Sequence, residues 1–259
     1  DWSSDVCSSD LSSSTISNPT VTSSTAGSTT YTLTVTSGAC SATDQVVVTV
    51  NPLPTVSAGT YAAVCVNGSS VTLSGSPAGG TFSGSGVTGN TFNPATAGVG
   101  TKTITYTYTN ANGCTNAATT NIVVNNITSV SAGTYAAVCV NGSSVTLSGS
   151  PSGGTFSGSG VTGNSFNPAA AGVGTKTITY TYTNANGCTS SATTTILVNA
   201  LPVVNAGTYS QVCVNGAPVT LSGTPAGGTF SGTGVSGSSF NPATAGVGTK
   251  TVTYTYTDA

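Results

Sequence analysis

The sequence predicts an all-β fold, and this prediction rests on three observations. Blocks of sequence return at a constant spacing, apolar residues alternate with Thr or Ser over short segments, and Gly, Pro, Asn and Ser separate these segments. Short strands at regular turn spacing, without a helical period, indicate antiparallel sandwiches rather than a parallel sheet. The expected architecture is therefore a tandem array of Ig-like antiparallel β-sandwich modules of about 74 residues each.

Cysteines mark the repeat. Cys65, Cys139 and Cys213 follow one another at one constant interval, and the same interval separates Cys114 from Cys188. The segment that begins Ala58-Gly-Thr-Tyr returns from Ala132 and, with changes, from Ala206. Short linkers such as Asn51-Pro-Leu-Pro54 leave little slack between neighbouring modules.

The repeat sets the expected domain boundaries. Residues 53–126, 127–200 and 201–259 are expected to be three Ig-like repeats, the last of them truncated before its final strand. Residues 12–52 are expected to be the C-terminal part of a truncated, related module, since 31–40 and 46–50 match the end of a repeat. The sequence is thus expected to be a middle piece of a longer protein.

Within one repeat the apolar period is two. Residues 101–109 place Thr on one face and Lys102, Ile104, Tyr106 and Tyr108 on the other, which favours a strand packed on one side. Asn67-Gly68 and Asn112-Gly113 predict hairpin-type turns, and the segments 77–80 and 93–94 predict further loops. About six or seven short strands are expected in each module, with no helix.

The cysteines are the one group of side chains for which several chemical roles have to be compared. Cys65 and Cys114 are as far apart in the sequence as Cys139 and Cys188, and we expect a disulfide within each of these two repeats. Each disulfide would stabilise a small domain by about 4 kcal/mol. Cys40 and Cys213 are expected to be unpaired because of truncation. Buried free thiols are the alternative, whereas zinc and catalytic thiols lack a histidine or another base.

Charged side chains are too scarce for most enzymatic chemistry. The chain has no His, three Lys and five Asp, and it contains neither Glu nor Arg. We therefore expect no catalytic residue, metal site or cofactor. Lys102, Lys176 and Lys250 are isolated from one another, so no basic patch for nucleic acid or anionic lipid is expected. No apolar run reaches the roughly 18 residues that a membrane span needs.

Two further patterns have competing interpretations. The aromatic residues could form sugar-binding platforms, but a small core is expected to use them; they are Tyr61, Phe82, Phe92, Tyr106 and Tyr108. The segment Gly84–Gly89 matches a dinucleotide fingerprint, yet no helix or acidic residue follows at the required place, so a loop is expected.

Residues 1–11, Asp-Trp-Ser-Ser-Asp-Val-Cys-Ser-Ser-Asp-Leu, resemble the translation of a common short-read sequencing adapter. The resemblance implies that Trp2 and Cys7 are artefacts, to be excluded from reasoning about the fold. A genuine Ser-rich leader is the alternative, although the segment has neither a basic n-region nor an apolar h-region.

Three phrases in order carry a resemblance to a known family: 79–87 (Gly-Gly-Thr-Phe-Ser-Gly-Ser-Gly-Val), 92–101 and 104–114. They resemble the Ig-like and PKD-like repeats of large secreted Bacteroidota-type surface proteins. The resemblance implies export, often by type IX secretion, and display on gliding or adhesive cells. Lys102 stands where common PKD modules have an aromatic residue, which is a departure from the PKD pattern.

The expected function is a non-catalytic stalk or multivalent adhesin at the cell surface or outside the cell. Its partners would be surface glycans or other cell-surface proteins. Repeated, nearly identical modules add length and avidity rather than distinct sites. Carbohydrate-binding accessory modules of a secreted hydrolase are the alternative, and an ice-binding or other surface role is a third hypothesis.

Overall fold

The computed structural model describes residues 2–4 and 11–258. Among these residues the regular structure is strand, apart from three helices of four residues each, so the predicted all-β sandwich fold is confirmed. The chain forms two compact units, and each is described by itself. The first comprises Asp1–Thr128 with Thr183–Thr189, and the second comprises Ser129–Tyr182 with Ser190–Ala259.

The first repeat folds as two sheets packed face to face. One sheet has the order β4-β10-β9-β6 and the other has the order β5-β8-β7. The strands are β4 (Val64–Cys65), β5 (Val71–Thr72), β6 (Thr81–Ser83), β7 (Val87–Thr88), β8 (Thr91–Phe92), β9 (Gly100–Thr109) and β10 (Thr115–Asn125).

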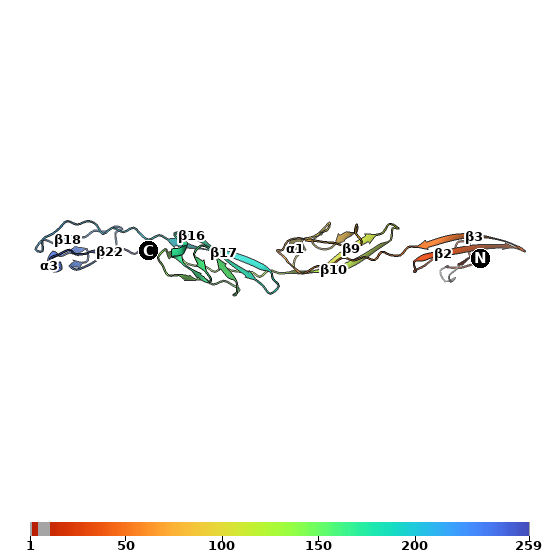
Figure 1. Ribbon diagram of the computed structural model, residues 1–259, viewed down its shortest axis with the longest axis horizontal. Coiled ribbons are helices and arrows are strands. Elements are labelled where there is room, and N and C mark those ends of the chain that lie inside the picture. Colours follow the sequence, from red (N-terminus) through yellow and green to blue (C-terminus); the bar gives the residue numbers. More distant parts are fainter. Residues whose placement is uncertain (1, 5–10, 259) are drawn as a thin grey trace. The chain divides into compact units, whose positions relative to one another are not determined.

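The β9–β10 hairpin is the longest feature of the repeat, and Figure 1 shows its two strands side by side. Its antiparallel register runs from Thr109 opposite Thr115 to Gly100 opposite Val124. Ile104 and Tyr106 are buried and Thr101 and Thr103 are exposed, as the period of two predicts. The tight turn at 110–113 uses Gly113, whose φ of 81° lies in the left-handed region that favours glycine.

The core lies between the two sheets. It is formed by the buried residues Leu73, Phe92, Ala97, Ile104, Ile122 and Val124. Tyr61 and Phe82 are half-buried and pack against this cluster. Tyr108, which was also expected in the core, is half-buried and lies outside the cluster, because β6 pairs with β9 only as far as Thr107.

Two local features differ from the expectation of purely antiparallel strands without helix. Strand β4 pairs in parallel with β10, since no hairpin joins these two strands and nothing forces them to run in opposite directions. The predicted loop at 93–94 opens a one-turn helix, α1 (Pro94–Ala97). The Asn93 side chain accepts hydrogen bonds from Ala95 N and Thr96 N, and Pro94 occupies a position where its missing N–H costs nothing.

A buried tyrosine ties the end of β9 to the loop before β6. The Tyr106 hydroxyl donates to the Pro77 carbonyl oxygen and accepts from Gly80 N at 2.8 Å. Its ring packs against Phe82 with centroids 4.6 Å apart. A Cβ at Gly75 or Gly80 would lie 2.6 Å from a ring carbon, so these glycines allow the backbone to approach the ring.

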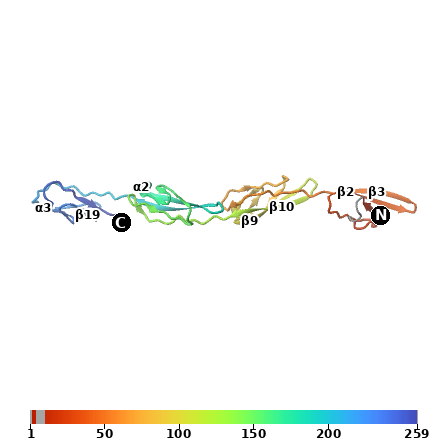
Figure 2. The same cartoon turned by 60° about the horizontal axis from the view of Figure 1, so that its bottom comes forward.

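The second repeat has the same topology, with sheets β11-β17-β16-β13 and β12-β15-β14. Figure 2 labels its helix α2. The elements are β11 (Val138–Cys139), β12 (Val145–Thr146), β13 (Thr155–Ser157), β14 (Val161–Thr162), β15 (Ser165–Phe166), α2 (Pro168–Ala171), β16 (Gly174–Thr183) and β17 (Thr189–Asn199).

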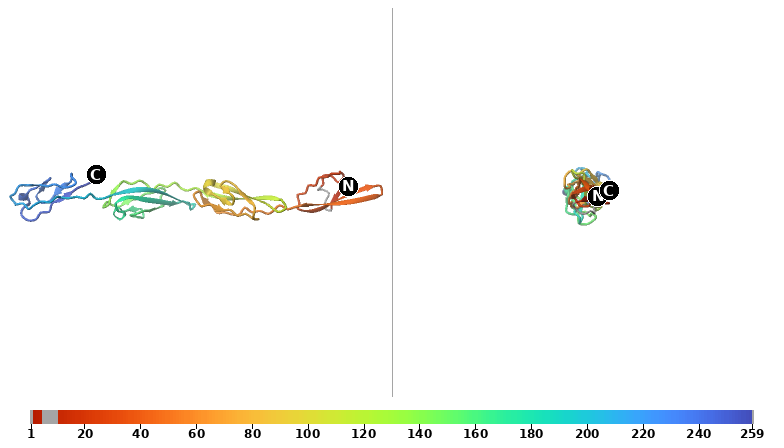
Figure 3. Two further views of the ribbon diagram at one scale, coloured as in Figure 1. Left: turned by 90° about the horizontal axis from the view of Figure 1, so that it is seen from above. Right: turned by 90° about the vertical axis from the view of Figure 1, so that its right-hand side faces the viewer.

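The third repeat keeps the three-stranded sheet β18-β21-β20, but its other sheet has only β19 and β22. Figure 3 shows the contrast between the long arrows of β16 and β17 and the short arrows of the blue third repeat. The elements are β18 (Val219–Thr220), β19 (Thr229–Ser231), β20 (Val235–Ser236), β21 (Ser239–Phe240), α3 (Pro242–Ala245) and β22 (Thr253–Thr255).

The residues before the first repeat form a single three-stranded sheet, β1-β2-β3. Strands β2 (Gly27–Ser37) and β3 (Cys40–Val50) are the counterpart of the β9–β10 hairpin. Strand β1 (Trp2–Ser4) pairs with β2 and falls in the segment that resembles adapter sequence. The rest of that segment up to residue 10, including Cys7, lies outside the described residues.

We expect Tyr106→Phe to destabilise the first repeat by roughly 1–3 kcal/mol, because the change leaves Gly80 N and Pro77 O without the hydroxyl that pairs with them. Hydrogen exchange of the β6 and β9 amides measures the effect within this repeat. Tyr108→Phe, outside the core cluster, is the matched control. Equal exchange rates in the two variants would contradict the role given to the Tyr106 hydroxyl.

Candidate functional site

The register of β10 places the two cysteines of a repeat at opposite ends of the sandwich. Cys65 in β4 lies opposite Asn125, the last residue of β10. Cys114 immediately precedes Thr115, the first residue of β10. A strand of this length spans about 35 Å at ~3.3 Å per residue. Disulfide-bonded cysteines have Cα atoms less than about 7 Å apart, so Cys65 and Cys114 cannot bond in this fold.

The structure instead contains a disulfide between Cys65 and Cys188, with Cα atoms 5.6 Å apart. The predicted pairings of Cys65 with Cys114 and of Cys139 with Cys188 are therefore wrong. Cys114 and Cys139 are free, as are Cys40 and Cys213. The bond joins the first cysteine of one repeat to the second cysteine of the following repeat.

The same geometry applies to the second repeat. Cys139 lies opposite Asn199 at the end of β17, and Cys188 precedes Thr189 at its start. A first cysteine therefore stands beside the exit of its own repeat, and a second cysteine stands at the hairpin tip, one strand length away. The two cysteines of one repeat are therefore too far apart to bond with each other.

Polar side chains surround the disulfide within the first compact unit. Cys188 is fully buried, and the Asn67 side-chain amide donates to the Thr189 carbonyl oxygen at 3.0 Å. The Asn184 carboxamide oxygen accepts from Cys188 N at 3.0 Å, while its Nδ2 donates to the Asn126 carbonyl oxygen at 2.9 Å. Asn184 thus holds the turn that presents Cys188 against the linker that precedes the second repeat.

The equivalent turn of the first repeat is built in the same way around a free thiol. Asn110 accepts from Cys114 N at 2.9 Å and donates to the Pro52 carbonyl oxygen at 3.4 Å. Cys114 Sγ donates to the Asn51 carbonyl oxygen at 3.8 Å. The turn that positions a second cysteine is therefore formed whether or not the disulfide is present.

The bond closes a large loop, because its two cysteines are 123 residues apart in sequence. On the chain-entropy estimate, such a loop stabilises the folded state by about 5 kcal/mol. The stabilisation is shared between two repeats, whereas a bond within one repeat would stabilise that repeat alone.

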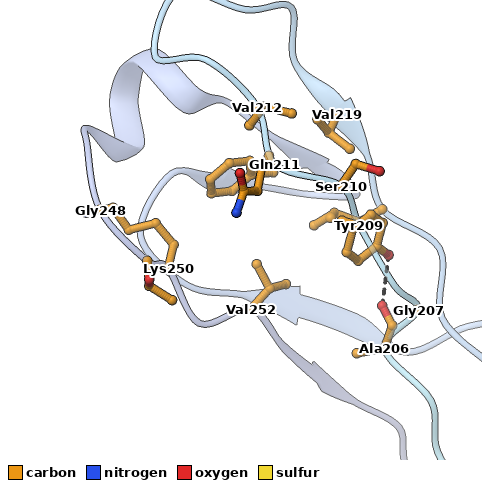
Figure 4. A pocket seen from close by; sticks show the side chains of 13 residues that line it. Ala206, Gly207, Tyr209, Ser210, Gln211, Val212, Val219, Gly248, Lys250 and Val252 are labelled. Carbon is orange, nitrogen blue, oxygen red and sulfur yellow. Dashed lines mark hydrogen bonds between the residues drawn. The ribbon is translucent and has the colours of Figure 1, made fainter.

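A hollow of about 660 Å³ lies in the third repeat. Apolar and polar side chains line it, among them Leu221 and Phe240. Figure 4 shows four others of the lining side chains, Tyr209, Val212, Lys250 and Val252. Tyr209 donates to the Ala206 carbonyl oxygen at 2.8 Å. These side chains hold no catalytic constellation, since Lys250 is the one titratable cation and no carboxylate lines the hollow.

The hollow is the space that a β10-type strand fills in the other repeats. Leu221, Phe240 and Val252 correspond to Leu73, Phe92 and Ile104, which pack in the first repeat against Ile122 and Val124. The third repeat has no such strand among its described residues, and Val212 and Val214 are 44% and 46% exposed. We therefore interpret the hollow as an open core rather than as a ligand pocket.

Other candidate chemistry is sparse in the part of the chain that the structure describes. There, no three His, Cys, Asp or Glu side chains gather closely enough to hold a metal ion. Residues 84–89, which match the dinucleotide fingerprint, belong to β7 and its flanking turns, and no helix follows directly. No helix among the described residues is long and apolar enough to cross a membrane.

Comparisons with known proteins add little. No family model and no curated protein matches the chain. Among solved structures, the chain is similar to one described as a Ca2+-stabilized adhesin that helps an Antarctic bacterium reach out and bind ice. The two are 16% identical, the match covers 80% of this chain and 68% of that one, and the TM-score is 0.32.

Trypsin can separate the possible disulfide pairings, because Lys102, Lys176 and Lys250 divide the cysteines among fragments. After thiols are blocked in denaturant, we expect fragment 1–102 to be joined to 177–250 through Cys65 and Cys188. Fragment 103–176, with Cys114 and Cys139, is expected to run alone. Mass spectrometry with and without reductant measures these species.

Fragment 177–250 contains two cysteines, Cys188 and Cys213, and two variants show which of them forms the link. Cys188→Ser should release fragment 1–102, whereas Cys213→Ser should leave the link unchanged, since Cys213 is free. A link that includes fragment 103–176 would instead support pairing within repeats and contradict the observed one.

Another prediction concerns the open core of the third repeat. Extending the chain after Ala259 with the sequence of residues 186–199 should fill the hollow, because this segment supplies the counterparts of Ile196 and Val198. Burying such side chains stabilises by roughly 1.5–3 kcal/mol each. The expected result is slower hydrogen exchange over residues 251–256. An extension with both apolar residues changed to Asp should give no protection; equal protection by both extensions would contradict the assignment.

Proposed function

We propose that this chain is a non-catalytic repeat region of a secreted bacterial surface protein, where it acts as a stalk or a multivalent adhesin. The observation that carries the proposal is the disulfide between Cys65 of one repeat and Cys188 of the next. Joining consecutive copies of one module covalently serves an extended array.

The disulfide also supports a location outside the cell. Disulfides form and persist in oxidising compartments and are rare where thiols are kept reduced. Cys188 is fully buried, so its bond is protected from reductants in solution. This chemistry supports an extracellular or cell-surface position, in agreement with the export that the Ig-like and PKD-like resemblance implies.

Repeated surfaces support multivalent action. The exposed Thr face of β9 returns on β16, where Thr175 and Thr177 are the counterparts of Thr101 and Thr103. Two linked copies of one weak binding surface raise the overall affinity by 10²–10⁴, roughly, when both can engage. Linked copies of a weak, uncharged binding surface therefore support the multivalent part of the proposal.

The carbohydrate-binding alternative finds less support. A sugar platform needs exposed aromatic rings with polar neighbours. Among residues 11–258 the one exposed aromatic ring is Tyr209, at the rim of the open core of the third repeat. In the first repeat its counterpart Tyr61 is half-buried and donates to the Ser74 carbonyl oxygen at 3.1 Å.

The test is binding of the full chain to bacterial cells and to a glycan array. For a multivalent adhesin, Thr103→Lys and Thr177→Lys should each weaken binding, and the double variant should weaken it by more than the product of the two effects. Thr43→Lys, on an exposed position of β3, is the control. A folded chain that binds neither probe supports a stalk. If the chain bound a soluble oligosaccharide saturably and Tyr209→Ala abolished this binding, carbohydrate recognition would replace both the stalk and the multivalent adhesin.

A further inference from the structure

The disulfide changes the covalent path between the two ends of the chain. Without it, any tension applied to the ends passes through every residue. With it, tension that reaches Cys65 can cross the sulfur atoms to Cys188 and continue from there. Residues 66–187 then form a closed side loop that carries no tension.

The loop contains nearly all of the two complete sandwiches. It includes β5 to β10 of the first repeat and β11 to β16 of the second. The core residues Leu73, Phe92, Ile104, Ile122 and Val124 of the first repeat all lie inside it, as do Leu147, Phe166 and Ile178 of the second. The core of the first repeat therefore lies entirely off the tension path, and of the core of the second repeat only Ile196 and Val198, on β17, lie on it.

The path continues through a segment that is already extended. Cys188 is followed at once by β17, which runs from Thr189 to Asn199 and leads to the linker before the third repeat. A strand rises about 3.3 Å per residue, and a fully extended chain reaches only about 3.3–3.6 Å per residue. Strand β17 is therefore already close to its maximum length and can extend very little when it is pulled along its axis.

We propose that the Cys65–Cys188 disulfide and strand β17 form a tension path that prevents the two complete repeats from being unravelled by force. The inference rests on the proposed function, since a stalk or adhesin is the kind of protein that is pulled from its ends. It goes further by assigning the cysteine pair a mechanical role and naming the residues that carry the force.

The experiment is single-molecule stretching of the full chain, held at its two ends, under oxidising conditions. Cys65→Ser opens the loop, so the final stretched length should increase by roughly 400 Å, from the 123-residue separation at about 3.3–3.6 Å per residue. The unaltered chain, reduced and thiol-blocked in denaturant before it is stretched, should give the same increase. The double variant Cys114→Ser, Cys139→Ser should stretch like the unaltered chain, since both thiols are free.

Two results would overturn the inference. Equal stretched lengths for Cys65→Ser and the unaltered chain would mean that no closed loop shortens the path. An increase of about 170 Å on Cys114→Ser alone would mean that bonds form within repeats, across roughly 49 residues at ~3.5 Å each. Neither result depends on ligand binding. A chain that binds no cell or glycan but lengthens on Cys65→Ser as expected would therefore retain the tension path while losing the adhesin function.

Discussion

The long β9–β10 hairpin is the constraint on which the rest of the structure depends. Its paired register runs almost the full length of the repeat and supplies Ile104, Ile122 and Val124 to the core. The same register fixes where the cysteines stand, because Cys114 occupies the hairpin tip and Cys65 lies beside the last residue of β10. A two-stranded ribbon thus places the two cysteines of each repeat at opposite ends of the sandwich. The third repeat shows how strongly the core depends on this ribbon. Its described residues include no β10-type strand, and Val212, the counterpart of half-buried Val64, is 44% exposed there.

Much of this architecture could be predicted from the sequence. The alternation over 101–109 predicts the face that Ile104 and Tyr106 bury, since a strand repeats every two residues. The helix α1 was not predicted, although Asn93 followed by Pro94 is a recognisable start signal for a helix. A single turn, however, has no apolar period that could distinguish it from a loop.

The disulfide pairing could not be predicted, for a different physical reason. Strand β4 is only two residues long, so no sequence pattern indicates that it lies on the far edge of β10 and runs parallel to it. The constant spacing of the repeated cysteines is equally compatible with bonds within repeats and bonds between them. Only the register of Cys65 against Asn125, about 35 Å from the hairpin tip, excludes the first possibility.

A bond between repeats also compensates for the limited stability of small sandwiches. Each repeat has a modest core, and domains of this size often need a covalent staple. A staple within a repeat would stabilise that repeat and leave the linker as the only connection to the next one. The Cys65–Cys188 bond stabilises two repeats at once and adds a second covalent connection beside the linker at 126–128. One pair of thiols per repeat can thereby serve both the stability of the modules and the continuity of the array.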